Sequence, residues 1–277
     1  AQQIHANLEG VDGFNIRNEG ALGGWMSVAL MVTYGGDTVQ AVDGRWVAVY
    51  NNNAMVSAIQ FMHDLRWQDD ATTSDIATWG NYALVLDFVA GKTAMTIASA
   101  DTLSWMIRNL TDLPIDDIGF GRMPNGGANA TLGTGRVWLY NPASSPETLA
   151  AAFAFNTWRE FDLAAFEHGV KLQAESGALV GLPYLNVFTG EYGQQRAVIV
   201  AQYANVPVAN YTNFINSGVA VRGEPPVAAQ ELYEELGQVL RQVLAAPDPN
   251  IKALLDASAA SFQVRVLDVI NAEGEAR

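Results

Sequence analysis

Two short segments place a tryptophan beside polar side chains near the start of an expected helix. They contain Asn18, Glu19 and Trp25 in one case, and Ser99, Asp101 and Trp105 in the other. An aromatic ring can cover the apolar C–H face of a sugar, while a carboxylate accepts hydrogen bonds from its hydroxyls. Ligands of open α/β sheets bind beyond the carboxyl ends of strands, where such turns lie. Both segments are therefore candidate carbohydrate sites, although core packing also explains each tryptophan and N-capping explains Asp101.

No pattern in the sequence indicates catalysis or metal binding. The three histidines, His5, His63 and His168, are far apart, and the chain has no cysteine. It also has neither a G-x-S-x-G nucleophile motif nor a phosphate-binding loop. We therefore expect no catalytic residue, no metal and no cofactor. A glycoside-active enzyme that uses Glu19 and Asp101 is the alternative, since glycosidases need two carboxylates across a cleft.

The composition is that of a folded, acidic protein. The chain has 277 residues, of which 49% are hydrophobic and 16% charged, and its formal net charge is −14. Bulk disorder is excluded by this balance. Nucleic acid and anionic membrane surfaces are poor partners, because phosphate binding needs clustered cations. No apolar run approaches the ~20 residues of a membrane span.

Strand and helix patterns alternate along the chain, which favours a layered α/β fold. The expected strands are 13–16, 45–50, 93–98, 118–122 and 137–140. The expected helices are 1–8, 25–34, 53–65, 79–90, 99–110, 145–167, 227–246 and 251–271. The first helix has no capping residue in front of it, so we interpret the chain as starting within an element, as a fragment does.

One segment resembles a known family. Residues 88–97, FVAGKTAMTI, match the F-x-x-G-K-x-A-M-x-I pattern of the family 1 extracellular solute-binding proteins of ABC importers, the sugar-type, maltose-binding-like group. Residues 117–124 resemble the D-x-G-x-x-x-x-P strand of this family, and 133–155 resemble its glycine-bearing strand, S-x-P-E turn and helix. Gly181-Leu182-Pro183 resembles its G-x-P turn. The resemblance covers essentially the whole chain.

The resemblance implies a periplasmic-binding-protein type II-like α/β lobe, with a mixed sheet and helices on both faces, plus a segment of the second lobe. Residues 1–130 and 170–277 would form the two parts of the C-terminal lobe. Residues 131–169 would form the hinge and a segment of the N-terminal lobe, most of which the chain would lack. By position in the family, Gly133, Thr134 and Tyr233 join the two candidate segments as ligand-binding residues.

The resemblance also implies a function and a location. The chain would bind a sugar or similar polyol between two lobes, outside the cytoplasm (in the periplasm or as a cell-surface lipoprotein), and deliver it to the membrane subunits of an ABC permease. Its other partner would be the missing N-terminal lobe or a second copy. A third hypothesis is an assembly module that pairs through 131–169, where the strand 137–140 would present an unpaired apolar edge.

Overall fold

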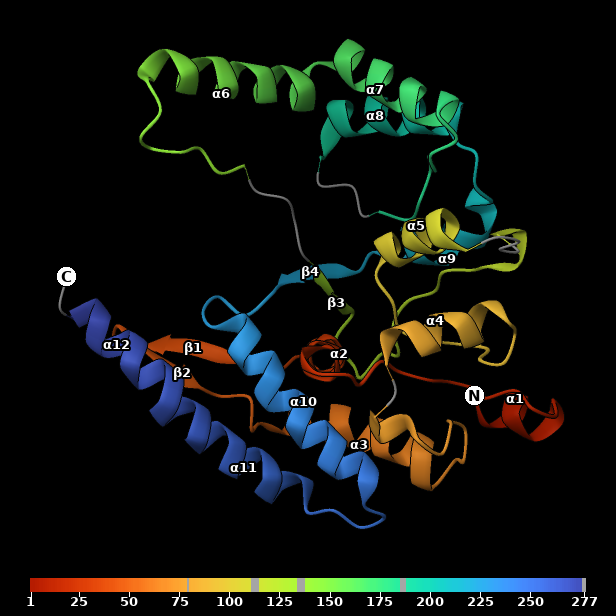
Figure 1. Cartoon of the computed structure of the whole chain (residues 1–277), viewed down its shortest axis with the longest axis vertical. Coiled ribbons are helices and arrows are strands. Elements are labelled where there is room, and N and C mark those ends of the chain that lie inside the picture. The colour runs from red at the N-terminus through yellow and green to blue at the C-terminus, as the bar shows by residue number, and fades with distance from the viewer. Residues whose placement is uncertain (79, 111–114, 134–137, 185–187, 276–277) are drawn as a thin grey trace. The chain divides into compact units, whose positions relative to one another are not determined.

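The computed structural model describes residues 1–78, 80–110, 115–133, 138–184 and 188–275. The chain forms two compact units, and each unit is discontinuous in sequence (Figure 1). Unit 1 contains residues 1–98, 123–134 and 218–277, and unit 2 contains 99–122 and 135–217. These boundaries differ from the predicted ones, because 99–122 and 170–217 are grouped with 135–169. The assignment of 131–169 to a second lobe stays a prediction.

Unit 1 is a helical core with short strands at its margins. Its helices are α1 (Gln2–Asn7), α2 (Ala21–Thr33), α3 (Asn53–Trp67), α4 (Asn81–Val89), α10 (Ala229–Ala245), α11 (Ile251–Phe262) and α12 (Asp268–Glu275), with a 3₁₀ turn at Ile76–Thr78 and a π-helical turn at Gln263–Leu267. Its strands are β1 (Val39–Val42), β2 (Arg45–Ala48), β3 (Ala130–Gly133) and β4 (Ala220–Gly223).

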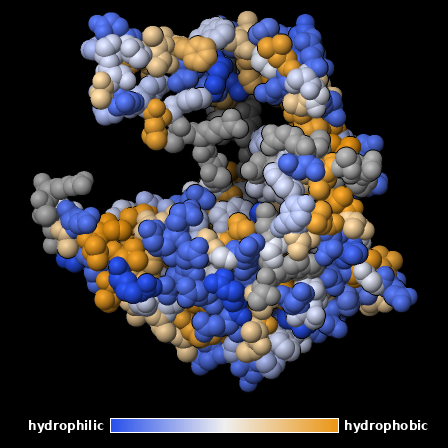
Figure 2. All heavy atoms as spheres, in the orientation of Figure 1, coloured by the Kyte–Doolittle hydropathy of each residue, from blue (hydrophilic) through white to orange (hydrophobic). Residues whose placement is uncertain are grey.

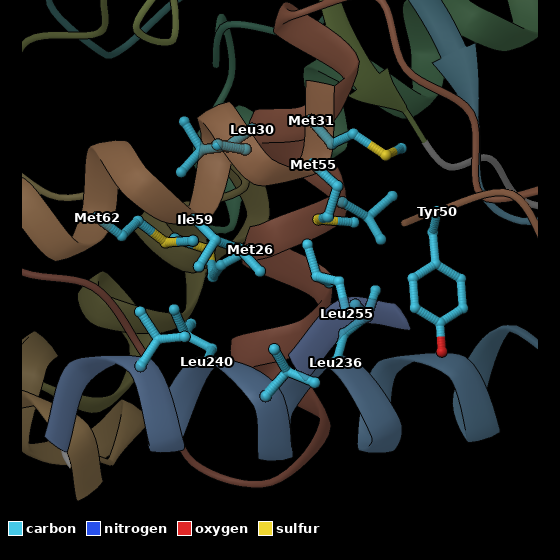
Figure 3. Close-up of a cluster of buried hydrophobic side chains, with 14 of the residues drawn as sticks. Met26, Leu30, Met31, Tyr50, Met55, Ile59, Met62, Leu236, Leu240 and Leu255 are labelled. Atoms are coloured by element: carbon cyan, nitrogen blue, oxygen red, sulfur yellow. The ribbon is translucent and has the colours of Figure 1, made fainter. Parts of the chain in front are cut away.

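Helix α2 is the centre of this core. Ten of its thirteen residues are buried, and α3, α10 and β3 pack around it. Figure 3 shows side chains from α2, α3, α10 and α11 meeting in one apolar cluster. An apolar helix without a polar face is expected to be fully enclosed. The cluster includes Met26, Met31, Met55 and Met62, whose unbranched side chains fill irregular gaps between helices.

Helix α2 crosses α10 at very short range, because glycines lie at the contact. An added Cβ on Gly24 would lie 2.0 Å from the carbonyl oxygen of Tyr233. One on Gly237 would lie 2.3 Å from the carbonyl oxygen of Gly20. Only glycine fits at these two positions, so the two backbones touch directly.

The predicted central strands are present as short parallel pairings. Asp12 bridges to Thr93 and Asn15 to Thr96 in parallel. Asn15 is fully buried and ties three segments together through hydrogen bonds to Asp12, Thr93 and the backbone N–H of Thr73. Strands β3 and β4 also pair in parallel, with Gly133 opposite Gly223.

Strands β1 and β2 form an antiparallel hairpin, as the strand pattern near 45–50 predicts. The turn residues Asp43 and Gly44 both have positive φ, at 49° and 77°, which is the conformation that a two-residue Asp-Gly turn favours. The hairpin leads into α3 through Asn52. The Oδ1 of Asn52 accepts from the N–H of Met55, and its Nδ2 donates to the carbonyls of Asp37 and Val49. One side chain therefore caps α3 and fixes the hairpin against it.

Unit 2 is helical in its described part. It contains α5 (Ala100–Asn109), α6 (Pro146–Phe161), α7 (Leu163–Glu175), α8 (Gly190–Tyr203) and α9 (Thr212–Ile215), with 3₁₀ turns at Ile115–Asp117 and Val208–Tyr211. Helix α6 begins at the predicted Ser145-Pro146 cap. The predicted helix 145–167 is divided at Asp162, which leaves the helical conformation (ψ 120°) and caps α7 by accepting from the N–H of Ala165.

Two predicted strands are absent from the described residues of unit 2. Residues 118–122 belong to no strand, because the segment beside them is a turn: the N–H of Phe120 donates to the carbonyl of Asn210 in the 3₁₀ turn Val208–Tyr211. In the segment 137–140, residue 137 lies outside the described part and 138–140 form no strand. The side chains of this segment contact α6 instead, with Trp138 under Arg159 and the Tyr140 hydroxyl accepting from Asn156.

Candidate functional site

The first candidate segment lies at the start of α2 and is built around Asn18. This side chain is fully buried, and its Nδ2 donates to the carbonyl of Ala77. Its Oδ1 accepts no hydrogen bond from a described residue, and a Cβ on Gly23 would lie 2.1 Å from it. A buried acceptor without a donor is uncommon and is costly to leave unsatisfied. Asn18 therefore offers an acceptor at the first turn of α2.

The carboxylate of Glu19 lies at the surface, against the start of a second helix. Glu19 is exposed, and a Cβ on Gly80, the N-cap of α4, would lie 2.9 Å from its Oε2. A carboxylate at a helix N-terminus is stabilised by the helix dipole. Glu19 can thus accept hydrogen bonds from a ligand and also supports α4.

Trp25 is half-buried in the first turns of α2 and packs against the core. The guanidinium carbon of Arg17 lies 5.6 Å from its ring centroid, within the range of a cation–π contact. A sugar stacked on Trp25 would use the part of the ring that Arg17 and the core leave exposed.

Tyr233 joins this region through α10, whose backbone touches Gly24. Its side chain is 2% exposed, and its hydroxyl has no hydrogen-bond partner of good geometry among the described residues. Burial raises the pKa of Tyr233, and the negative charge of nearby Glu224 raises it further. The phenol therefore stays protonated at physiological pH and can act as a donor.

Arg241, which no pattern in the sequence indicates, also belongs to this region. Its Nη1 donates to the carbonyl of Gly20 at 3.2 Å and lies 3.5 Å from the carbonyl of Asn18. It holds the loop 18–20 in place from α10. The sequence gives little indication of this role, because a single arginine on an amphipathic helix is usually exposed to solvent.

The second candidate segment lies in unit 2. Ser99 precedes α5, but its side chain caps no backbone N–H and instead lies 3.3 Å from the Thr102 hydroxyl. Trp105 is half-buried in α5. Asp101 belongs to α5, and its side chain lies outside the described part of the structure. The N-cap of α5 is Ser99 and Asp101 lies inside the helix, so the N-cap interpretation of Asp101 is wrong. Its ligand role stays a prediction.

Of the two predicted hinge residues, the structure describes Gly133 and not Thr134. Gly133 ends β3, where a Cβ would lie 2.2 Å from Cγ1 of Val221. A close strand contact therefore explains the glycine. Thr134 lies outside the described residues. Of the nine predicted ligand residues, Asn18, Glu19, Trp25 and Tyr233 lie around the start of α2 in unit 1.

Two further polar side chains, those of His63 and Trp67, have structural partners. The Nε2 of buried His63 lies 3.1 Å from the carbonyl of Ala246, and the indole N–H of Trp67 donates to that of Leu244, so both side chains cap the end of α10. Within the described residues, no group of three or more His, Asp or Glu side chains could hold a metal ion. In the same part of the chain, no helix has the length and apolar character to cross a membrane.

Comparison with known proteins finds similarity in structure only. No family model matches the sequence, and no curated protein matches it. Three solved structures match 94–95% of this chain with TM-scores of 0.59–0.61. They are maltose-bound MalE3 of T. maritima (18% identity), an ABC transporter solute-binding protein of Thermotoga lettingae with α-D-tagatose (14%), and the maltose/maltodextrin-binding domain MalE of Bdellovibrio bacteriovorus with maltotriose (19%).

These similarities confirm the predicted fold class. The chain has the α/β fold of periplasmic-binding-protein-like solute-binding proteins, as the segment 88–97 indicates. It spans 61–62% of the length of the matched structures. At 14–19% identity the similarity concerns the fold, and it does not transfer a ligand or a site.

Proposed function

We propose that this chain is part of a substrate-binding component of an ABC importer that binds a carbohydrate or similar polyol without catalysis. The observation that carries the proposal is the match of 94–95% of the chain to three solute-binding proteins whose structures contain maltose, tagatose or maltotriose. Delivery to a membrane permease and an extracytoplasmic location belong to the same proposal.

The side chains around the start of α2 have the chemistry that sugar binding needs, with Glu19 exposed, Trp25 partly exposed, and Asn18 and Tyr233 buried. Glu19 supplies an exposed acceptor, and Asn18 supplies a buried acceptor that no described donor satisfies. Trp25 supplies a partly exposed ring, and Tyr233 a protonated phenol. A sugar presents both hydroxyl donors and an apolar C–H face to such a set. Arg241 holds the loop that carries Asn18 and Glu19 and so keeps these groups in position.

Calorimetry and tryptophan fluorescence with maltose, maltotriose and tagatose test the proposal. We expect saturable binding in the millimolar range, because the chain spans only part of the matched length. Glu19→Gln and Trp25→Ala should weaken it about tenfold each, since a ligand hydrogen bond or ring contact is worth about 1–2 kcal/mol. Trp158→Ala, which removes an exposed tryptophan of α6, is the matched control. Equal affinities for all variants, or no binding to any sugar, would contradict the proposal.

The enzyme alternative is tested with the same variants. A chromogenic glycoside that is hydrolysed by the native chain and not by Glu19→Gln would show catalysis. We expect no hydrolysis by either, because no motif in the sequence selects a catalytic pair of carboxylates.

A specific observation also favours the assembly role of 131–169. Helix α6 has sixteen residues and no buried one, and its exposed side chains include Phe153, Phe155, Trp158 and Phe161. Figure 2 shows apolar and polar side chains side by side over this helix. An apolar surface of this kind favours contact with further polypeptide, either the rest of the lobe or a second copy. Light scattering that shows a monomer at high concentration would count against the second copy.

A further inference from the structure

The outer edge of β2 is covered by amide side chains instead of a third strand. The N–H of Val49 donates to the carbonyl of Thr38, and β2 pairs with β1 in the register Trp46 to Ala41. In an antiparallel pair, alternate residues direct their backbone groups away from the partner strand. In β2 these are Trp46 and Ala48, whose outward groups would otherwise form an open edge.

Two side chains of the C-terminal helices complete that edge. Asn271 binds both backbone groups of Trp46: its Oδ1 accepts from the N–H at 2.7 Å, and its Nδ2 donates to the carbonyl at 3.0 Å. Gln263 accepts from the N–H of Ala48 at 2.8 Å and donates to the carbonyl of Trp46 at 3.2 Å. Each amide repeats the donor and acceptor that a strand residue would present. Asn271 is 6% exposed, so this contact is also shielded from water.

The π-helical turn between α11 and α12 explains how both amides reach the same strand. Gln263 and Asn271 are eight residues apart, and eight residues of α-helix turn ~800°, which would leave them ~80° apart around the axis. A π-helical turn contains roughly one extra residue, so the rotation falls to ~700°, within ~20° of two full turns. The turn covers Gln263–Leu267 and thus lies between them. Figure 1 shows α12 running beside the hairpin.

We propose that Gln263 and Asn271 replace a third strand on β2, and that this contact keeps the edge closed against β2 of a second copy of the chain. An open edge is a template for pairing with another chain. The isologous partner of an exposed β2 is the same edge on a second molecule. The proposal concerns unit 1 alone and does not depend on sugar binding.

The double variant Gln263→Ala/Asn271→Ala tests it by hydrogen exchange and light scattering. The amides of Trp46 and Ala48 should exchange at least tenfold faster, and the protein should self-associate as its concentration rises. Gln40→Ala is the matched control, because Gln40 lies exposed in the same hairpin and its side chain donates only to Asp37. Unchanged exchange of Trp46 and Ala48, or a monomer at every concentration, would overturn the proposal.

Asn271→Asp keeps the test valid where the double variant does not fold. An ionised carboxylate accepts from the Trp46 N–H but cannot donate to the Trp46 carbonyl, whereas a protonated one does both. Protonation restores the donor to the Trp46 carbonyl, so stability relative to the native chain should be recovered as the pH falls and the new carboxyl becomes protonated. A deficit that is the same at neutral and mildly acidic pH would show that Asn271 only fills space and would overturn the proposal.

Discussion

Replacing Gly24 with alanine tests the helix crossing that positions Tyr233. The added Cβ would lie 2.0 Å from the carbonyl oxygen of Tyr233 and 2.6 Å from its Cα, whereas ordinary contacts begin at 3.4 Å. These are backbone atoms of a buried helix, so no side-chain rotation relieves the overlap. Helices α2 and α10 would have to separate by about 1.4 Å.

The expected loss follows from two opposing effects. Overpacking of this kind costs about 3 kcal/mol, the upper end of its usual range, because backbone has to move. Alanine gains up to about 1 kcal/mol over glycine in a helix interior. The net loss of unfolding free energy is then ~2–3 kcal/mol. At about 2–4 °C per kcal/mol for a unit of this size, the melting temperature should fall by ~4–12 °C.

Thermal unfolding followed by circular dichroism measures the effect. The matched control is Gly274→Ala in α12, which lies in the same unit and has no atom within 4 Å of the added Cβ. The control should be neutral or slightly stabilising. If Gly24→Ala melts at the same temperature as Gly274→Ala, the backbones do not cross at the described distance and the reasoning is wrong.

Three further predictions concern single side chains. Asn52→Ala, which removes a cap and two further hydrogen bonds, should cost ~2–3 kcal/mol of unfolding free energy. Asn250→Ala, which removes only the α11 cap that accepts from the N–H of Ala253, should cost ~1 kcal/mol. Equal losses in urea titration would contradict this. Gly169→Ala should stabilise unit 2 by ~0.5–1 kcal/mol in the same assay, because Gly169 lies inside α7 and nothing lies within 4 Å of an added Cβ. A lower free energy of unfolding would contradict this. Burial raises the pKa of Tyr50 and of Tyr233. Because these tyrosines ionise first in the unfolded chain, the free energy of unfolding should fall as the pH rises above about 10. Substituting both by phenylalanine should make that fall less steep, and an unchanged slope would show that other groups cause it.

Local signals in the sequence predict most helices and the hairpin. The cap at Ser145-Pro146, the apolar face of 227–246 and the strand near 45–50 all have their expected structures. They could be predicted because capping and periodicity act over a few residues. Asp162 is also a local signal, since an aspartate before an apolar helical run favours an N-cap.

The remaining features depend on contacts that are distant in sequence. The sequence pattern of 251–271 predicts one continuous helix, whereas the structure has a π-helical turn at Gln263–Leu267. This turn accompanies the contact of Asn271 with Trp46, which is 225 residues away in the sequence. The strand pattern at 118–122 has no adjacent strand among the described residues and stays unpaired. Arg241 acts on a loop more than 200 residues away. The sequence identifies the types of the predicted ligand residues. Only the structure shows that the buried Oδ1 of Asn18 accepts no hydrogen bond from a described residue.

The order in which the two units alternate along the chain has a consequence for synthesis. The chain passes between them at 98–99, 122–123, 134–135 and 217–218, so unit 1 is complete only when its last segment, from 218 onward, has left the ribosome. Helix α2 is made early and has ten buried residues, but α10, which encloses it, begins at residue 229. While some 200 residues are translated, the apolar side chains of α2 therefore remain without the helix α10 that buries them. The nascent chain is expected to need a holding chaperone on 21–33 during that interval.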